Sequence, residues 1–147
     1  MKVLIQRVIT SSVEVDNRIV GKISKGLLLF VAFTKFDSIK EIEYMVDKIV
    51  NLRIFDDEKG IMNKSLLNIE GSILSVSQFT LYGDSTKGRR PSYIKALNGA
   101  EALKLYNLFN NKLQEKVSKV ETGIFGADMK VQIVNDGPVT IMLEKKF

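Results

Sequence analysis

The strongest constraint on the fold is one continuous apolar run, LLLFVAF, at residues 27–33, which follows Gly26. A strand with one wet face alternates apolar and polar residues, whereas a run without any polar residue is typical of a strand buried on both faces. The run therefore predicts a strand in the interior of the domain. A membrane helix needs about 20 apolar residues, so this run is too short to span a bilayer, and we expect no membrane association.

The segments before this run are predicted to be strands. Residues 1–15 alternate and contain many β-branched residues, and residues 18–23 resume that pattern after the turn pair Asp16-Asn17. Alternating segments separated by such a pair favour a β-hairpin.

After the run, the apolar spacing becomes helical. Ser38 and Glu41 form a capping box, and apolar residues then recur at helical spacing, which predicts a helix over residues 38–51. A second helix is expected to begin at Pro91 or at Asn98 and to continue to about residue 116.

Further strands are expected from alternating or β-branched segments at residues 52–55, 72–81, 129–134 and 139–143. The last two are expected to be joined by a turn at residues 135–138. This order predicts an α+β fold, with one domain over residues 1–147, a curved, barrel-like sheet that is mostly antiparallel or mixed, and two helices packed on one side. No GxGxxG or Walker-type loop is present, so nucleotide binding by those loops is not supported.

The composition excludes several kinds of chemistry, because the chain has no histidine, no cysteine and no tryptophan. It cannot form a Ser-His-Asp or Cys-His nucleophile, a thiol redox centre or a zinc site of the His/Cys type. Proton transfer would have to use carboxylates, hydroxyls, lysine, backbone dipoles or the substrate itself. We expect no cofactor and no metal site, and the lack of cysteine and of a signal segment favours the cytoplasm.

The formal net charge of +5 permits an anionic partner, and the distribution of charge says more than the sum. The segment between Asp84 and Glu101 has no acidic residue and contains four basic ones, Lys87, Arg89, Arg90 and Lys95. Such a loop is either solubilising charge or a contact to phosphates.

Two short segments combine polar groups with a constrained backbone. The segment SQFTL at residues 77–81 ends a predicted strand before Gly83, which leaves backbone N–H groups that can be aimed at a ligand. In GPVT at residues 137–140, Gly137 permits unusual dihedral angles and Pro138 fixes its own φ. By spacing alone, the simpler explanations are favoured: a polar strand edge for the first segment and an ordinary hairpin turn with a trans bond for the second.

With these segments, the sequence resembles the D-aminoacyl-tRNA deacylase (D-tyrosyl-tRNA deacylase) family along its whole length. The motifs that carry the resemblance are KVLIQRV at residues 2–8, LRIF at 52–55, MN at 62–63, SQFTL at 77–81, GRRP at 88–91, TGIFGADM at 122–129 and GPVT at 137–140.

The resemblance implies an enzyme that hydrolyses the ester bond of D-aminoacyl-tRNA, and of mischarged glycyl-tRNA, as proofreading of translation. It implies a homodimer in which a cis Gly137-Pro138 bond enters the active site of the partner subunit and rejects L-amino acids. It also implies a catalytic pocket lined by Ser77, Gln78, Phe79 and Thr80, with the Phe79 N–H near the ester. Implied support for the pocket comes from Met129, Val139 and Thr140, and contacts to tRNA phosphates are expected from Lys87, Arg89 and Arg90.

Two mechanisms are compatible with these residues. Thr80 could attack the ester, but a hydroxyl is a weak nucleophile without an adjacent base, and neither lysine nor a carboxylate adjoins Thr80 in the sequence. Alternatively, the 2′-OH of the terminal ribose helps to activate water while backbone N–H groups hold the oxyanion. We favour the second mechanism.

Two other classes of protein fit the sequence less well. A non-catalytic RNA-binding module would share the basic loop but is expected to display an interleaved aromatic and basic stripe, which this sequence lacks. A hydrolase with paired carboxylates is disfavoured, because Asp56, Asp57 and Glu58 cluster in one turn instead of facing each other from separate elements.

Overall fold

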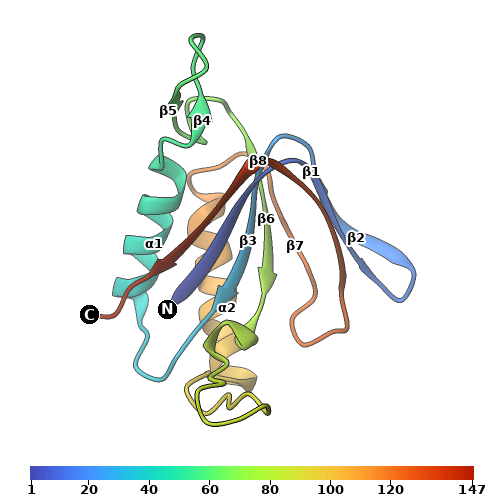
Figure 1. Ribbon diagram of the computed structural model, residues 1–147, viewed down its shortest axis with the longest axis vertical. Coiled ribbons are helices and arrows are strands. Elements are labelled where there is room, and N and C mark those ends of the chain that lie inside the picture. Colours follow the sequence, from blue (N-terminus) through green and yellow to red (C-terminus); the bar gives the residue numbers. More distant parts are fainter.

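The computed structural model describes all of residues 1–147 (Figure 1). Its sheet is built around one long strand, β1, which pairs with three other strands. The elements in chain order are β1 (Lys2–Val15), β2 (Arg18–Ile23), β3 (Gly26–Ala32), α1 (Ile39–Asn51), β4 (Phe55–Asp56), β5 (Met62–Lys64), β6 (Ser72–Ser77), the short 3₁₀ helix η1 (Phe79–Tyr82), α2 (Gly99–Gln114), β7 (Val120–Thr122) and β8 (Lys130–Glu144).

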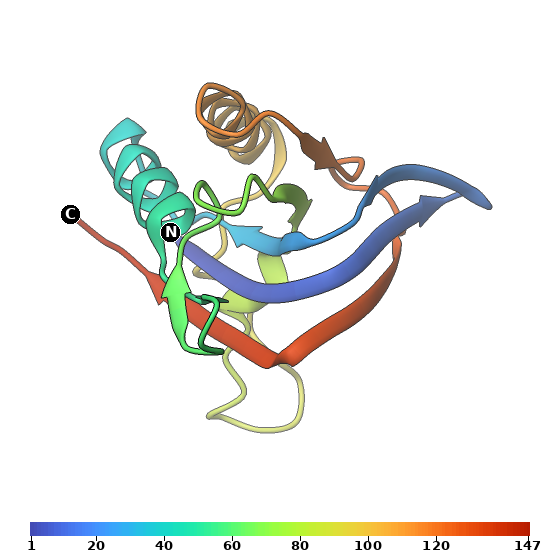
Figure 2. The same cartoon turned by 90° about the horizontal axis from the view of Figure 1, so that it is seen from above.

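The sheet is mixed and curls into a nearly closed barrel. The first half of β1 pairs with β3 and its second half with β2, while β8 runs along the other side of both halves, and all these pairs are antiparallel. On the far side of β3, the strands β6 and β7 are added in parallel. Figure 2 shows both helices on the same side of the strands, so the predicted α+β fold is confirmed.

The apolar run at residues 27–33 is buried on both faces, as predicted. Leu27 and Leu29 belong to the larger core beneath the helices. Leu28 points the other way, into a second core with Val8 and Leu74. Alternate residues of β3 therefore fill two separate apolar layers, which explains why the run contains no polar residue.

Two local predictions are confirmed in detail. Asp16 and Asn17 both have positive φ, at 50° and 62°, as a tight hairpin turn between right-handed twisted strands requires. The capping box at Ser38 and Glu41 is formed in full at the start of α1.

The second helix, α2, begins with Asn98 as its N-cap, the later of the two expected positions.

The prediction of a strand over residues 72–81 was wrong after Ser77. The last ladder bond is donated by the Gln78 N–H to the Val31 carbonyl. The chain then turns, because the Leu81 N–H bonds to the Gln78 carbonyl and the Gly83 N–H bonds to the Thr80 carbonyl.

The prediction of two closing strands joined by a turn was also wrong. Residues 130–144 form one strand, since both halves of β8 pair with the single long strand β1 instead of with each other. The strand expected at residues 52–55 shrinks to Phe55–Asp56, and two strands of three residues, β5 and β7, were missed because so few residues show no periodicity.

Candidate functional site

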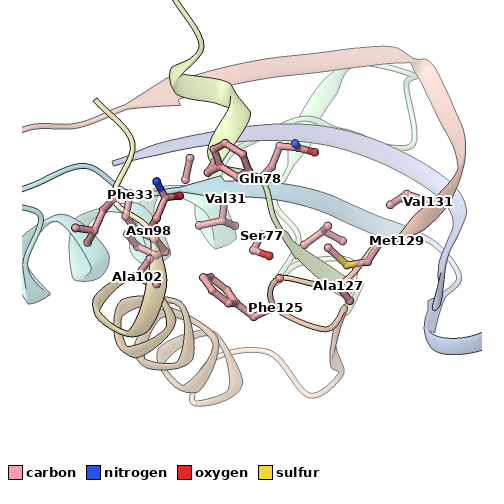
Figure 3. Close-up of a pocket in the computed structure, with 16 residues that line it drawn as sticks. Val31, Phe33, Ser77, Gln78, Asn98, Ala102, Phe125, Ala127, Met129 and Val131 are labelled. Atoms are coloured by element: carbon pink, nitrogen blue, oxygen red, sulfur yellow. The ribbon is translucent and has the colours of Figure 1, made fainter. Parts of the chain in front are cut away.

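A cavity of about 520 Å³ opens where β3 and β6 end, between the start of α2 and the segment that leads into β8 (Figure 3). Its wall is mostly apolar, and no Asp, Glu, Lys or Arg lines it. The cavity can therefore enclose an uncharged or aromatic group, but its walls offer no side chain that could serve as a general acid or base.

The end of β6 supplies the polar edge of the cavity. Ser77, Gln78 and Phe79 all line it, and the Ser77 side chain points into it in Figure 3. Because the strand turns into η1 at this point, the N–H of Phe79 donates to no other group of the protein. A free backbone donor at the edge of an apolar cavity is suited to hold an oxygen atom that gains negative charge.

Thr80 lies apart from this wall. Its side chain is exposed and does not line the cavity. Its hydroxyl oxygen accepts a hydrogen bond from the Gln78 side-chain amide, and no carboxylate or amine bonds to it.

The start of α2 forms the opposite edge. Asn98, Gly99 and Ala102 line the cavity. Asn98 does not cap the helix with its side chain, which donates instead to the Ala96 carbonyl. The first N–H groups of α2 are thus left without a side-chain cap beside the cavity, where the helix dipole favours negative charge.

The back wall is fixed by a buried tyrosine. The ring of Tyr106 packs against Phe125, a lining residue, with 5.7 Å between ring centroids. Its hydroxyl donates to the Ser75 carbonyl at 2.8 Å, and the Gly123 N–H donates to the same oxygen atom. Burial raises the pKa of the Tyr106 phenol, so this donor keeps its proton at neutral pH.

Met129 lines the same side of the cavity and lies close against the chain. A Cβ atom added at Gly123 would come within 2.6 Å of its sulfur. Glycine at 123 therefore makes room for the Met129 side chain.

The other predicted segment forms a bulge in β8, here called the β8 bulge (residues 135–140). Gln6 of β1 pairs with Thr140, and Val8 pairs with Asn135. Residues 136–139 of β8 are therefore looped out of the ladder. The Gly137–Pro138 peptide bond is cis, and Gly137 has φ of 119°.

The β8 bulge lies outside the cavity of its own chain. Gly137 and Pro138 are exposed, and neither they nor Val139 nor Thr140 line the cavity.

Two residues that the sequence analysis missed hold the β8 bulge. Arg7 is buried and donates to the carbonyl oxygens of Ile54, at 2.7 Å, and Asp136, at 3.2 Å. The Asn135 side chain donates to the carbonyls of Arg7 and Val139 and so replaces the missing ladder bonds.

A signal for Arg7 was present in the sequence. It occupies an inward position of an alternating strand, two residues after the buried Ile5, and a charged residue at such a position needs dedicated partners.

The basic loop (residues 84–92) lies in the connection between η1 and α2, and both of these elements contribute residues to the cavity wall. It is closed by two backbone hydrogen bonds between Asp84 and Ser92, of 2.9 and 2.8 Å, and its cations Lys87, Arg89 and Arg90 are all exposed. The chain then returns to the cavity wall at Leu97. Neither helix is long and apolar enough to cross a membrane, and no three His, Cys, Asp or Glu side chains converge as metal ligands would.

Comparison with known proteins gives a consistent result. Residues 4–144 match the family described as D-Tyr-tRNA(Tyr) deacylase. The chain is 57% identical over 146 residues to the D-aminoacyl-tRNA deacylase of Clostridium botulinum (strain Hall), covering 99% of this chain and 98% of that protein. It is 56% identical, with the same coverage, to the D-aminoacyl-tRNA deacylase of Clostridium tetani (strain Massachusetts).

Two solved structures share the fold. One, described as c-Myc DNA Unwinding Element Binding Protein, has a TM-score of 0.95 and 40% identity over 100% of both chains. The other, described as a probable eukaryotic D-amino acid tRNA deacylase, has a TM-score of 0.83 at 20% identity over 97% of both chains.

Proposed function

The chain belongs to the D-Tyr-tRNA(Tyr) deacylase family and is thus a hydrolase acting on an ester bond, and we propose that its cavity holds the aminoacylated 3′ end of tRNA. The observation that carries this proposal is the apolar cavity with the free Phe79 N–H at its edge. We place the reaction in the cytoplasm, where charged tRNA is used, with D-aminoacyl-tRNA and mischarged glycyl-tRNA as substrates.

The reaction is proposed to proceed with help from the substrate. Water attacks the carbonyl carbon of the ester, the 2′-OH of the terminal ribose takes a proton from this water, and it gives its own proton to the departing 3′ oxygen. The Phe79 N–H holds the oxyanion that forms meanwhile. The absence of any ionisable side chain from the cavity wall supports this route, because no residue there could act as the base.

Replacement of Thr80 separates this route from nucleophilic attack by threonine. Because the Thr80 hydroxyl accepts a bond from Gln78 and has no basic partner, we expect Thr80→Ala to lower the single-turnover rate by less than about tenfold. Loss of several orders of magnitude in a folded variant would instead establish Thr80 as the nucleophile.

Selection against L-amino acids is proposed to come from the partner subunit of a homodimer. In one chain, Gly137 and Pro138 are exposed and away from the cavity, which suits a segment that enters the site of another copy. The open edge of β8 carries exposed apolar side chains at Ile133, Val134 and Met142, which suits an interface. A fixed backbone near the α-carbon would collide with an L side chain, whereas glycine has none and is accepted. Val139 and Thr140 are proposed to support this segment.

Affinity for tRNA is proposed to come from Lys87, Arg89 and Arg90. Phosphate contacts weaken as salt increases, so Arg89→Ala and Arg90→Ala should each weaken tRNA binding and flatten its salt dependence. If both the Kd and its dependence on salt were unchanged, the basic residues of the loop would contribute only to solubility and would not contact tRNA.

The activity itself is tested with matched D-tyrosyl-tRNA and L-tyrosyl-tRNA. We expect release of the D-amino acid only. Equal release from both substrates would contradict the proposed selectivity. Tight binding of tRNA without release would favour the alternative of a non-catalytic RNA-binding module.

A further inference from the structure

Tyr93 is an aromatic residue at the mouth of the cavity for which the proposed reaction has no use. Its ring contacts Phe79 edge to face, with ring centroids 5.2 Å apart and an interplanar angle of 75°. Phe79 lines the cavity. The two rings form a continuous aromatic surface that leads from the cavity to the outside, and Tyr93 remains 37% exposed and Phe79 47% exposed.

The backbone around Tyr93 is held in place. The paired hydrogen bonds between Asp84 and Ser92 end immediately before it, and its own carbonyl accepts a bond from the Ala96 N–H at 2.9 Å. Gly83 lies against the ring, since a Cβ atom there would be only 3.0 Å from Tyr93 Cε1. A half-exposed ring on a fixed backbone offers a stacking surface that loses little entropy on binding.

Basic residues flank Tyr93 in the chain on both sides. The basic loop immediately precedes Tyr93, and Lys95 follows it two residues later with an exposed side chain. Lys95 has only one weak ionic contact, 4.0 Å from Asp84. Aromatic rings among cations are the features that bind single-stranded nucleic acid, by base stacking and by phosphate contacts.

We propose that Tyr93, backed by Phe79, stacks on the base of the unpaired nucleotide that precedes the terminal nucleotide of the RNA. This inference rests on the proposed function, because the terminal nucleoside must occupy the cavity for its neighbour to pass over Tyr93. The phosphate between the two nucleotides then faces the cations of the basic loop.

Binding measured without catalysis tests the stack directly. We would compare a short RNA hairpin that carries an unpaired 3′ end with the same hairpin made blunt, using Tyr93→Leu, Tyr93→Phe and the control Tyr44→Leu. Tyr44 is a matched control, because it is 38% exposed, lies on α1 and does not line the cavity.

Tyr93→Leu should raise the Kd for the hairpin with the unpaired end about tenfold, as expected for the loss of one base–aromatic stack, and should leave the Kd for the blunt hairpin unchanged. Tyr93→Phe keeps the ring and should bind as the wild type does, as should Tyr44→Leu. Equal weakening for both hairpins, or none for either, would overturn the proposal.

Rates of hydrolysis of two esters show whether Tyr93 stacks on a base or only holds Phe79 in position. The ratio of kcat/KM for D-tyrosyl-tRNA to that for D-tyrosyl-adenosine should fall about tenfold in Tyr93→Leu. An equal loss on both esters would overturn the proposal in favour of a role in supporting Phe79. A changed oligomeric state of Tyr93→Leu in sedimentation would also overturn the proposal, because it would place Tyr93 at a contact between copies of the chain. A wild-type protein that hydrolyses neither ester contradicts the proposed function alone, since the hairpin measurement still decides on the stack.

Discussion

The cavity edge and the β8 bulge differ in whether their backbone groups have hydrogen-bond partners. At the cavity edge, the N–H of Phe79 has no partner and the start of α2 has no side-chain cap. At the β8 bulge, the polar side chains of Arg7 and Asn135 replace the ladder bonds that the looped-out residues lose. The first region keeps donors available for a ligand, and the second is fixed in one shape with its tip exposed.

This difference indicates what each region contributes. A site with free donors can bind and polarise an ester. Its walls of mostly apolar side chains do not by themselves distinguish a D-amino acid from an L-amino acid. A fixed, exposed backbone segment can exclude one stereoisomer but cannot catalyse on its own. Neither region alone accounts for a chirally selective hydrolase, which is why we propose that they meet between two subunits.

The largest effect is expected from removing the support of the β8 bulge. Arg7→Leu loses three hydrogen bonds from a buried charged group, to the carbonyls of Asp136 and Ile54 and to the Asp56 carboxylate, and should lower the free energy of unfolding by about 2–3 kcal/mol. Deacylation of D-tyrosyl-tRNA should fall with it, as denaturant titration and a release assay would report.

Arg53→Leu is the matched control for Arg7. Arg53 is exposed and donates only to the nearby Asn63 carbonyl, so its replacement should change stability by less than about 0.5 kcal/mol. An effect of Arg53→Leu equal to that of Arg7→Leu would show that the β8 bulge has no special dependence on Arg7.

A smaller and more selective effect is expected from filling the cavity. Ala102 is buried in its wall, and Ala102→Leu should abolish most deacylation while the free energy of unfolding falls by about 1 kcal/mol. Ala100→Leu, on the exposed side of the same helical turn, should remain active. Full activity of Ala102→Leu would exclude this cavity as the binding site.

The smallest effect on deacylation is expected from Glu41, which belongs to neither region and contributes to acid stability. Burial raises the pKa of Glu41, but bonds from the Ser38 hydroxyl and from the backbone N–H groups of Phe147 and Ser38 outweigh burial and hold the pKa at about 2, below the ordinary value of 4.5. The stability contributed by Glu41 is therefore complete above pH 4.5 and is lost as the pH falls toward 2.

Replacement of Glu41 tests this assignment. Glu41→Gln should cost about 3 kcal/mol at neutral pH and flatten the pH dependence of unfolding between pH 4.5 and 2, with unchanged deacylation. An unchanged acid dependence would assign that loss of stability to other carboxylates.

The sequence predicted best where structure depends on neighbours in the chain. The capping box of α1, the Asp16-Asn17 turn and the doubly buried strand β3 are all encoded within a few residues. The path of residues 135–140 is not, because it depends on β1 pairing with both halves of β8 across more than a hundred residues.

The candidate site divides in the same way. Ser77, Gln78, Phe79 and Met129 were singled out from motifs and lie together at the cavity. The exposed position of Thr80 follows from the turn after Ser77, which alternation alone did not reveal. Arg7, Tyr106 and Asn135 act through contacts that only the folded chain creates.

Mixing two inactive variants tests most directly whether the cavity and the β8 bulge meet between subunits. Ala102→Leu blocks the cavity. Gly137→Ala disturbs the β8 bulge, because its Cβ atom would lie 2.9 Å from Arg7 Nη2 at a φ of 119°. After complete subunit exchange in an equal mixture, half of the dimers are mixed and each has one intact composite site, so about a quarter of wild-type deacylation should return. A mixture that exchanges subunits and stays as inactive as its components would contradict the account, because the site would then lie within one chain.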